Sequence, residues 1–71
     1  MTDNAFPTRL RQLREARHVD RKALGELCGR SKNIIGQYES GEKIPSLETV
    51  IALADYFSVS VDYLLGRENK K

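Results

Sequence analysis

The chain has 71 residues, one cysteine and a formal net charge of +2 at pH 7. This length allows one domain with one small hydrophobic core and leaves little room for a substrate cleft, and a single cysteine excludes an internal disulfide. The longest apolar run, residues 50–54, is far shorter than a membrane span, and the first residues lack the basic and apolar segments of a signal peptide. We therefore expect a cytoplasmic protein that neither spans a membrane nor is secreted.

The first expected helix covers residues 6–17, where apolar side chains recur at helical spacing. Its apolar face consists of Phe6, Leu10 and Leu13. Arg9 and Arg11 fall on the exposed flank of this helix, whereas Arg14 lies four residues after Leu10 and borders the apolar face. The spacing therefore predicts that Arg14 is partly buried.

A second helix is expected over residues 21–28, because Asp20 can accept hydrogen bonds from the amides of a first helical turn. Cys28 faces the core, and Gly29 is a stop signal. A turn of three residues then leads into the stretch S-K-N-I-I-G-Q-Y-E-S-G at residues 31–41. Two short helices joined by such a turn are typical of a helix-turn-helix motif.

The stretch at residues 31–41 has two chemically different faces, with Ser31 as the expected N-cap and Gly41 as the expected end of the helix. The apolar face consists of Ile34, Ile35 and Tyr38. The outward face consists of Lys32, Asn33, Gly36 and Gln37. Lysine can pair with phosphate or guanine, and Asn and Gln can each form two hydrogen bonds to adenine in the major groove. Taken alone, the pattern also fits an ordinary amphipathic helix with a solvated polar face.

The last third of the chain is expected to be mostly structural. Ser46 can cap a helix over residues 47–57. The broad apolar face of this helix is expected to include Leu47, Val50, Ile51, Leu53, Ala54 and Phe57. Ser60 can cap a short last helix over residues 61–65, which ends at Gly66.

The expected domain covers residues 6–66, between a flexible N-terminus at residues 1–5 and a charged mobile tail at residues 67–71. Charge is divided unevenly along this domain. Residues 9–43 carry nine basic side chains against five acidic ones, whereas residues 44–66 carry three acidic side chains and no basic one. This division favours one surface that meets a polyanion, although helices also carry mixed surface charge without a partner.

Several sequence motifs follow one another over most of the chain. They are L-R-x-x-R at residues 13–17, A-L-G-E-L-C-G at 23–29, the stretch at 31–41, P-S-L at 45–47 and V-S-V-D-Y-L-L-G at 59–66. Their order resembles the lambda-repressor-like transcriptional regulators of the Cro/CI or XRE type. The resemblance implies an all-α fold, with a compact five-helix DNA-binding domain whose helix-turn-helix lies in helices two and three.

The resemblance also implies roles for particular residues. Base reading in the major groove is implied for Lys32, Asn33 and Gln37. Phosphate contact is implied for Arg21, Ser31 and Lys43. A salt bridge between helix one and the end of helix three is implied for Arg14 and Glu39. A weak homodimer is implied, with a dimer surface at Ile51, Tyr56 and Tyr63, although exposed aromatic side chains also occur without a partner.

Several positions depart from the usual pattern of the family, and Arg21 and Gly36 bear most directly on the helix-turn-helix. Arg21 stands where helix two usually begins with Gln, and this changes the geometry of the available hydrogen bonds. Gly36 lies in the middle of the expected recognition helix, where glycine costs about 1 kcal/mol relative to alanine. Gly36 either admits a DNA group close to the backbone or is merely tolerated. We favour tolerance, because nothing in the sequence requires the close approach.

Two functions fit these observations. The first is sequence-specific binding of double-stranded DNA as a transcriptional regulator, with repression favoured and the recognition helix in the major groove of an inverted-repeat operator. The alternative is a protein-interaction module on the same fold, such as an antitoxin or another partner-binding protein. An enzyme is not expected, because no acid and base are paired in a cleft. Cys28 and His18 supply too few ligands for a metal site, so we expect no metal, cofactor or small-molecule substrate.

Overall fold

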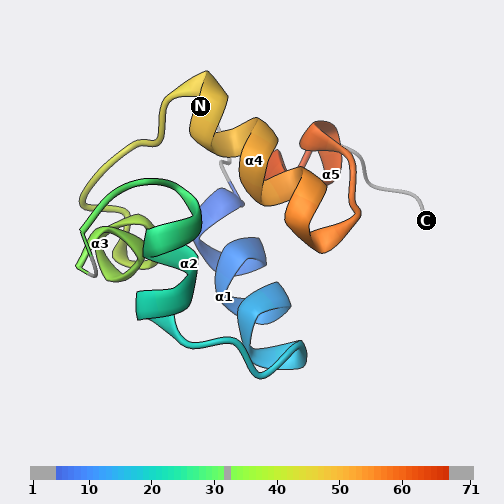
Figure 1. Ribbon diagram of the computed structural model, residues 1–71. Coiled ribbons are helices and arrows are strands. Elements are labelled where there is room, and N and C mark those ends of the chain that lie inside the picture. The colour runs from blue at the N-terminus through green and yellow to red at the C-terminus, as the bar shows by residue number, and fades with distance from the viewer. Residues whose placement is uncertain (1–4, 32, 68–71) are drawn as a thin grey trace.

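The computed structural model describes residues 5–31 and 33–67, and within these ranges it contains helices and no strand (Figure 1). The helices are α1 (Phe6–Ala16), α2 (Arg21–Leu27), α3 (Ile34–Ser40), α4 (Leu47–Phe57) and α5 (Val61–Leu65). The predicted all-α fold with five short helices is therefore confirmed. The expectations for residues 1–4, Lys32 and residues 68–71 lie outside the described residues.

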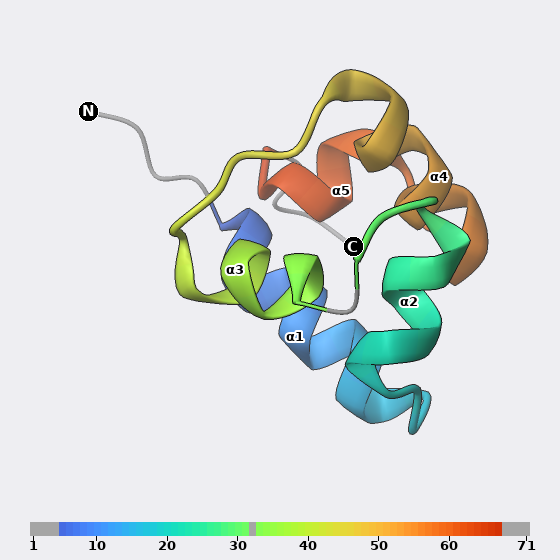
Figure 2. The same ribbon diagram turned by 60° about the vertical axis from the view of Figure 1, so that its left-hand side comes forward.

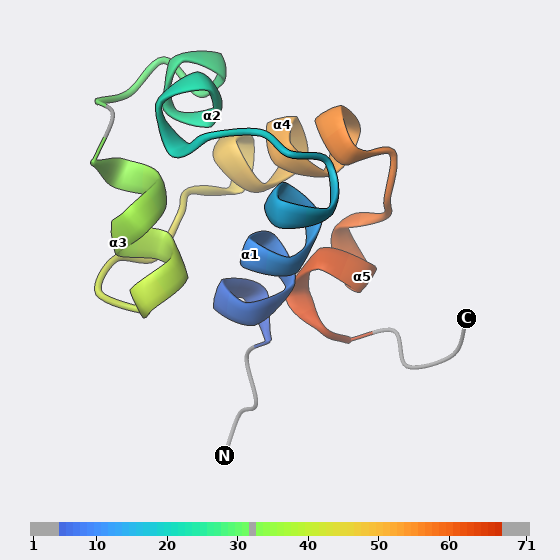
Figure 3. The same ribbon diagram turned by 90° about the horizontal axis from the view of Figure 1, so that it is seen from below.

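The hydrophobic core receives at least one fully buried side chain from every helix. These side chains include Leu10 of α1, Leu24 of α2, Ile35 of α3, Leu53 and Phe57 of α4 and Leu64 of α5. Figure 3 shows α1 in the middle of the molecule, and it packs against α3 on one side and α5 on the other. Each fully buried side chain of this size contributes about 1.5 to 3 kcal/mol, so the apolar face of α3 is firmly held by the core.

Local side-chain caps begin three of the helices as predicted. Asp20 accepts a hydrogen bond from the amide of Ala23 at 2.7 Å, and Ser60 accepts one from the amide of Tyr63 at 2.9 Å. Ser46 likewise accepts from the amide of Thr49 at 3.3 Å. These bonds satisfy amides that have no partner inside the helix, and they fix where α2, α4 and α5 begin.

Two of the helices end at a glycine in the left-handed region, as the sequence predicted. Gly41 follows α3 with φ of 83°, and Gly66 follows α5 with φ of 79°. A side chain at Gly66 would also collide with the Cβ of Ala5, so the end of α5 lies directly against the residue before α1. The close approach and the positive φ both require glycine at this position.

The prediction that Ser31 caps the recognition helix is wrong. α3 begins at Ile34, its N-cap residue is Asn33, and no side chain caps it. Gly29 adopts φ of 70°, and the amide of Arg30 bonds back to the carbonyl of Gly25 at 2.9 Å, so the chain is still leaving α2 at this point.

The expected exposure of Arg9 is also wrong, because Arg9 links α1 to the end of α5. Its Nη1 donates to the carbonyl oxygen of Tyr63 at 2.7 Å, and its guanidinium lies 4.1 Å from the centre of the Tyr63 ring. Arg17 links α1 to the end of α4 in the same way, with Nη2 donating to the carbonyl of Phe57 at 2.8 Å. These cations bond to carbonyls in the last turns of two other helices, so part of the basic charge in residues 9–43 has a structural role.

Candidate nucleic-acid interface

α3 presents one side to the core and the other to solvent. Ile35 and Tyr38 are almost fully buried, and the Tyr38 ring packs edge-on against Phe6 with ring centres 5.9 Å apart. Figures 1 and 3 agree that no other helix covers the outer side of α3. The core therefore fixes both the position and the rotation of the helix that carries Gln37 and has Asn33 as its N-cap.

The side-chain amides of Asn33 and Gln37 are free to bind a partner. Asn33 is exposed and Gln37 is half-buried, and neither amide group bonds to another residue in the described parts of the chain. An Asn or Gln amide offers both a donor and an acceptor, which is the combination that reads adenine. Lys32, the third predicted base-reading residue, lies outside the described residues.

The loop after α3 is attached to the end of that helix by its backbone. The carbonyl oxygen of Gln37 accepts hydrogen bonds from the amides of Glu42 at 2.9 Å and Lys43 at 3.2 Å. Figure 2 shows this loop running from the end of α3 to α4 along the outside of the molecule. The exposed Lys43 is thus held one short turn away from Gln37.

Ser31, the third predicted phosphate contact, is exposed just before α3, and its carbonyl accepts a hydrogen bond from the amide of Ile34 at 3.2 Å.

A buried ion pair joins α1 to α3, as the family resemblance implied. Arg14 Nε donates to Glu39 Oε2 at 2.6 Å, and Arg14 Nη2 donates to Glu39 Oε1 at 3.2 Å. The two side chains are only 11% and 6% exposed. The hydrogen bond to Glu39 raises the pKa of Arg14 above its ordinary value, although burial opposes this change. Because the ion pair is bidentate and largely excluded from solvent, it fixes the position of α3 relative to α1.

Arg21 is the second cation of this cluster. Its Nε lies 3.5 Å from Glu39 Oε1, while its side chain is 54% exposed. Its aliphatic part crosses the backbone of α3 at Gly36, where an added Cβ would lie 3.8 Å from Arg21 Cδ and 4.0 Å from Arg21 Nε. These are ordinary van der Waals separations, so an alanine fits at position 36.

Replacing Gly36 with alanine should therefore stabilise the fold by about 0.5 to 1 kcal/mol, because alanine has the higher helix propensity and needs no rearrangement here. Urea unfolding followed by circular dichroism measures the difference. Gly41→Ala is the matched control, since φ of 83° at that position strains an alanine and should make the same substitution destabilising. A destabilised Gly36→Ala protein would contradict this result. Loss of DNA affinity by a more stable Gly36→Ala protein would instead favour a close approach of DNA to the backbone.

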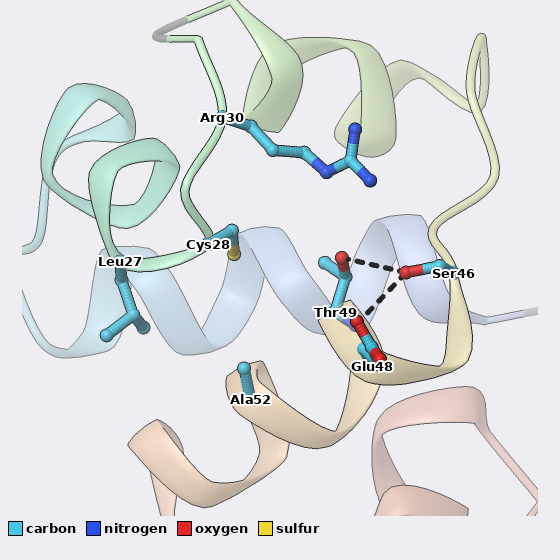
Figure 4. Close-up of a pocket in the computed structure, with 7 residues that line it drawn as sticks. All are labelled: Leu27, Cys28, Arg30, Ser46, Glu48, Thr49 and Ala52. Carbon is cyan, nitrogen blue, oxygen red and sulfur yellow. Dashed lines mark hydrogen bonds between the residues drawn. The ribbon is translucent and has the colours of Figure 1, made fainter.

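A pocket of about 230 Å³ lies between the end of α2, the turn and the start of α4 (Figure 4). It is lined by Leu27, Cys28, Arg30, Ser46, Glu48, Thr49 and Ala52. Figure 4 shows Arg30 extending from the turn above the hydroxyls of Ser46 and Thr49, which lie 3.1 Å apart. Burial raises the pKa of the Cys28 thiol above its ordinary value, and the charge of Arg30 only partly opposes this. The thiol is therefore a weak nucleophile.

The predicted dimer surface is only partly open. Ile51 and Tyr56 are each 43% exposed, whereas Tyr63 is half-buried with one ring face under the guanidinium of Arg9. Three other large apolar side chains are more exposed, Leu27 at 46%, Ile44 at 85% and Leu47 at 70%. Leu47 and Ile51 belong to the predicted apolar face of α4, but both are exposed. Since residues share a face at spacings of three and four, the fully buried Leu53 and Phe57 define that face, and Leu47 and Ile51 fall beyond its edge.

No group of three or more His, Cys, Asp or Glu side chains in residues 5–31 and 33–67 is arranged to hold a metal ion. Among the same residues, every helix is too short or too polar to cross a membrane.

Comparisons with known proteins agree with the fold and with the order of the motifs. A family model described as helix-turn-helix matches residues 10–64. The HTH-type transcriptional regulator YobD of Bacillus subtilis is 45% identical over 58 residues, which cover 82% of this chain and 52% of YobD. The chain spans about half the length of the curated relatives it matches.

Two solved structures are similar over almost the whole chain. A transcriptional regulator from Listeria innocua has a TM-score of 0.90 at 28% identity, over 99% of this chain and 65% of that one. The P22 c2 repressor, solved in complex with a synthetic operator, has a TM-score of 0.82 at 33% identity, over 94% of this chain and 100% of that one. The chain therefore belongs to the helix-turn-helix family, in the lambda-repressor-like group of XRE-type regulators that its motifs resemble.

Proposed function

We propose that this chain is a transcriptional regulator that binds double-stranded DNA sequence-specifically, with α3 in the major groove. The observation that carries the proposal is the pair of amide side chains of Asn33 and Gln37, neither of which bonds to another described residue. They lie at the N-cap and on the exposed side of α3, whose other side packs into the core. The similarity to the P22 c2 repressor, which was solved on an operator, supports repression as the mode of action.

In the proposed complex, one set of residues contacts DNA phosphates and another set contacts base edges. Arg21, Ser31 and Lys43 contact phosphates and hold the protein in register, while Lys32, Asn33 and Gln37 read bases. Asn33 and Gln37 each suit the N6 and N7 positions of adenine, and Lys32 suits the O6 and N7 acceptors of guanine. A protein held in this way over a promoter blocks access by polymerase.

We further propose that the chain binds an inverted repeat as a weak homodimer, with half-sites about 34 Å apart along the DNA. Contact between the two copies would use the exposed apolar side chains at Ile51 and Tyr56, with Tyr63 at the margin under Arg9. This function needs neither catalysis, a cofactor nor a small-molecule substrate. It places the protein in the cytoplasm, where bacterial DNA lies.

A second candidate function is a protein-interaction module on the same fold. It is favoured by one observation, the strong exposure of Ile44 and Leu47 at the start of α4, because large apolar side chains left open to water often mark a protein interface. In this alternative the partner would be another protein, and the outer side of α3 would have no role.

A titration with random-sequence duplex DNA at two salt concentrations separates the two functions. With three phosphate contacts in each subunit, we expect the affinity of one subunit to fall about 40-fold between about 50 and 200 mM salt, because each neutralised phosphate releases counterions. An interaction module would show little affinity at either concentration. Absence of binding at the lower salt concentration would therefore overturn the proposed function.

A further inference from the structure

Glu39 is positioned to orient a second arginine in addition to stabilising the fold. Its carboxylate is 6% exposed and is held by two hydrogen bonds from Arg14, at 2.6 and 3.2 Å. A carboxylate fixed in this way cannot follow the movements of a third side chain. Arg21, which reaches it from the first turn of α2, must therefore adjust to Glu39.

The contact between the two side chains uses only one edge of the Arg21 guanidinium. Nε lies 3.5 Å from Glu39 Oε1, whereas neither terminal nitrogen of Arg21 bonds to any residue in the described parts of the chain. A guanidinium carries five donors in a rigid plane, so fixing Nε also fixes the direction of the two terminal nitrogens. Since the Arg21 side chain is 54% exposed, this pair of terminal nitrogens is available to a ligand.

Gly36 leaves room for this arrangement. The Cδ and Nε of Arg21 pass 3.8 and 4.0 Å from the point where a Cβ at position 36 would lie. A methyl group fits at that distance, but a longer side chain would occupy the space that Arg21 crosses on its way to Glu39. The small residue in the middle of α3 and the arginine at the start of α2 are thus parts of one local arrangement.

We infer that Glu39 positions Arg21, so that the Nε edge is anchored on α3 and the two terminal nitrogens form a preset bidentate site for a DNA phosphate. The inference rests on the proposed function and names Glu39 as a positioning residue for the phosphate contact. Lysine cannot replace Arg21 in this role, because one ammonium group cannot bind Glu39 along one edge and grip a phosphate with a planar pair of donors.

The first experiment compares Arg21→Lys with wild type on random-sequence duplex DNA over a series of salt concentrations. We expect Arg21→Lys to bind DNA about tenfold more weakly, because it loses about one hydrogen bond to a charged group. The dependence of its affinity on salt concentration should not change, because lysine keeps the positive charge. Arg11→Lys is the matched control, since Arg11 Nε also contacts a carboxylate, Glu15 Oε2 at 3.3 Å, on the exposed flank of α1. The control should bind like wild type.

The second experiment is a double-mutant cycle with Glu39→Gln. If charge alone mattered, removing an acid beside the DNA would tighten binding. Positioning predicts the opposite: binding should weaken about threefold or more in the wild-type background, yet hardly change in the Arg21→Lys background, because Glu39 acts through Arg21. Circular dichroism at the titration temperature must show each variant folded, so that lost stability does not mimic lost affinity.

The outcomes separate this inference from the function on which it rests. If wild type does not bind duplex DNA, the proposed function and the inference both fail. If wild type binds but Arg21→Lys binds equally well, or Glu39→Gln binds more tightly, only the positioning role is overturned. Equal weakening by Glu39→Gln in both backgrounds would also overturn it, because the effect would then not pass through Arg21.

Discussion

Replacing Arg14 with alanine should lower the free energy of unfolding by about 3 kcal/mol, because removal of one partner leaves the other charge of a largely buried pair with little compensation. Glu39 is only 6% exposed and would keep only Arg21, whose Nε is 3.5 Å away. The carbonyl oxygen of Val19 would also lose the hydrogen bond from Arg14 Nη1 at 3.3 Å. For a domain of this size, the loss corresponds to a fall in Tm of about 12 to 24 °C.

Urea unfolding of Arg14→Ala beside Arg11→Ala measures this effect. The pair formed by Arg11 and Glu15 is exposed, so the control should change the free energy of unfolding by less than about 0.5 kcal/mol. A normal Tm for Arg14→Ala together with weakened DNA binding would show that Arg14 is a DNA contact and that its structural assignment is wrong.

Replacing Asn33 or Gln37 with alanine should reduce the preference for the cognate DNA site by about 1 to 3 kcal/mol each, the value of one bidentate contact to a base. Affinity for random duplex DNA should hardly change, because these side chains are not expected to hold phosphates. The fold should be unaffected, since neither side-chain amide bonds to another described residue.

Fluorescence anisotropy with a cognate and a random duplex measures both affinities for each variant. Lys43→Ala is the contrasting variant, which should weaken both affinities by a similar factor and lower the salt slope by about 1. If Asn33→Ala and Lys43→Ala changed the two affinities in the same proportion, the division between base reading and phosphate contact would be contradicted.

Local chemistry was readable from the sequence because it needs only neighbouring residues. Asp20, Ser46 and Ser60 each accept from an amide three residues later, and such caps operate within one turn. The same reasoning failed at Ser31, because the exit from α2 involves Gly29 in a left-handed conformation and a bond between Arg30 and Gly25. A side chain that could cap a helix does so only where the backbone allows the helix to begin.

Contacts between distant residues were not accessible from periodicity. The pair of Arg14 and Glu39 spans 25 positions and was expected only because of the family resemblance. The bonds from Arg9 to Tyr63 and from Arg17 to Phe57 span 54 and 40 positions, and a count of charges assigned both arginines to the basic surface. Such bonds depend on the positions of the last turns of α4 and α5 in the folded protein. The spacing of apolar residues in α1 does not predict these positions.

Selection of bound sequences from a random duplex pool tests the central claim most directly, that the outer side of α3 reads DNA. The wild-type protein should enrich a site with two inverted half-sites whose centres are about 10 base pairs apart. The variant carrying both Asn33→Ala and Gln37→Ala should enrich that site far less while still binding the pool. A wild-type selection that yields no common sequence would contradict sequence-specific reading by α3.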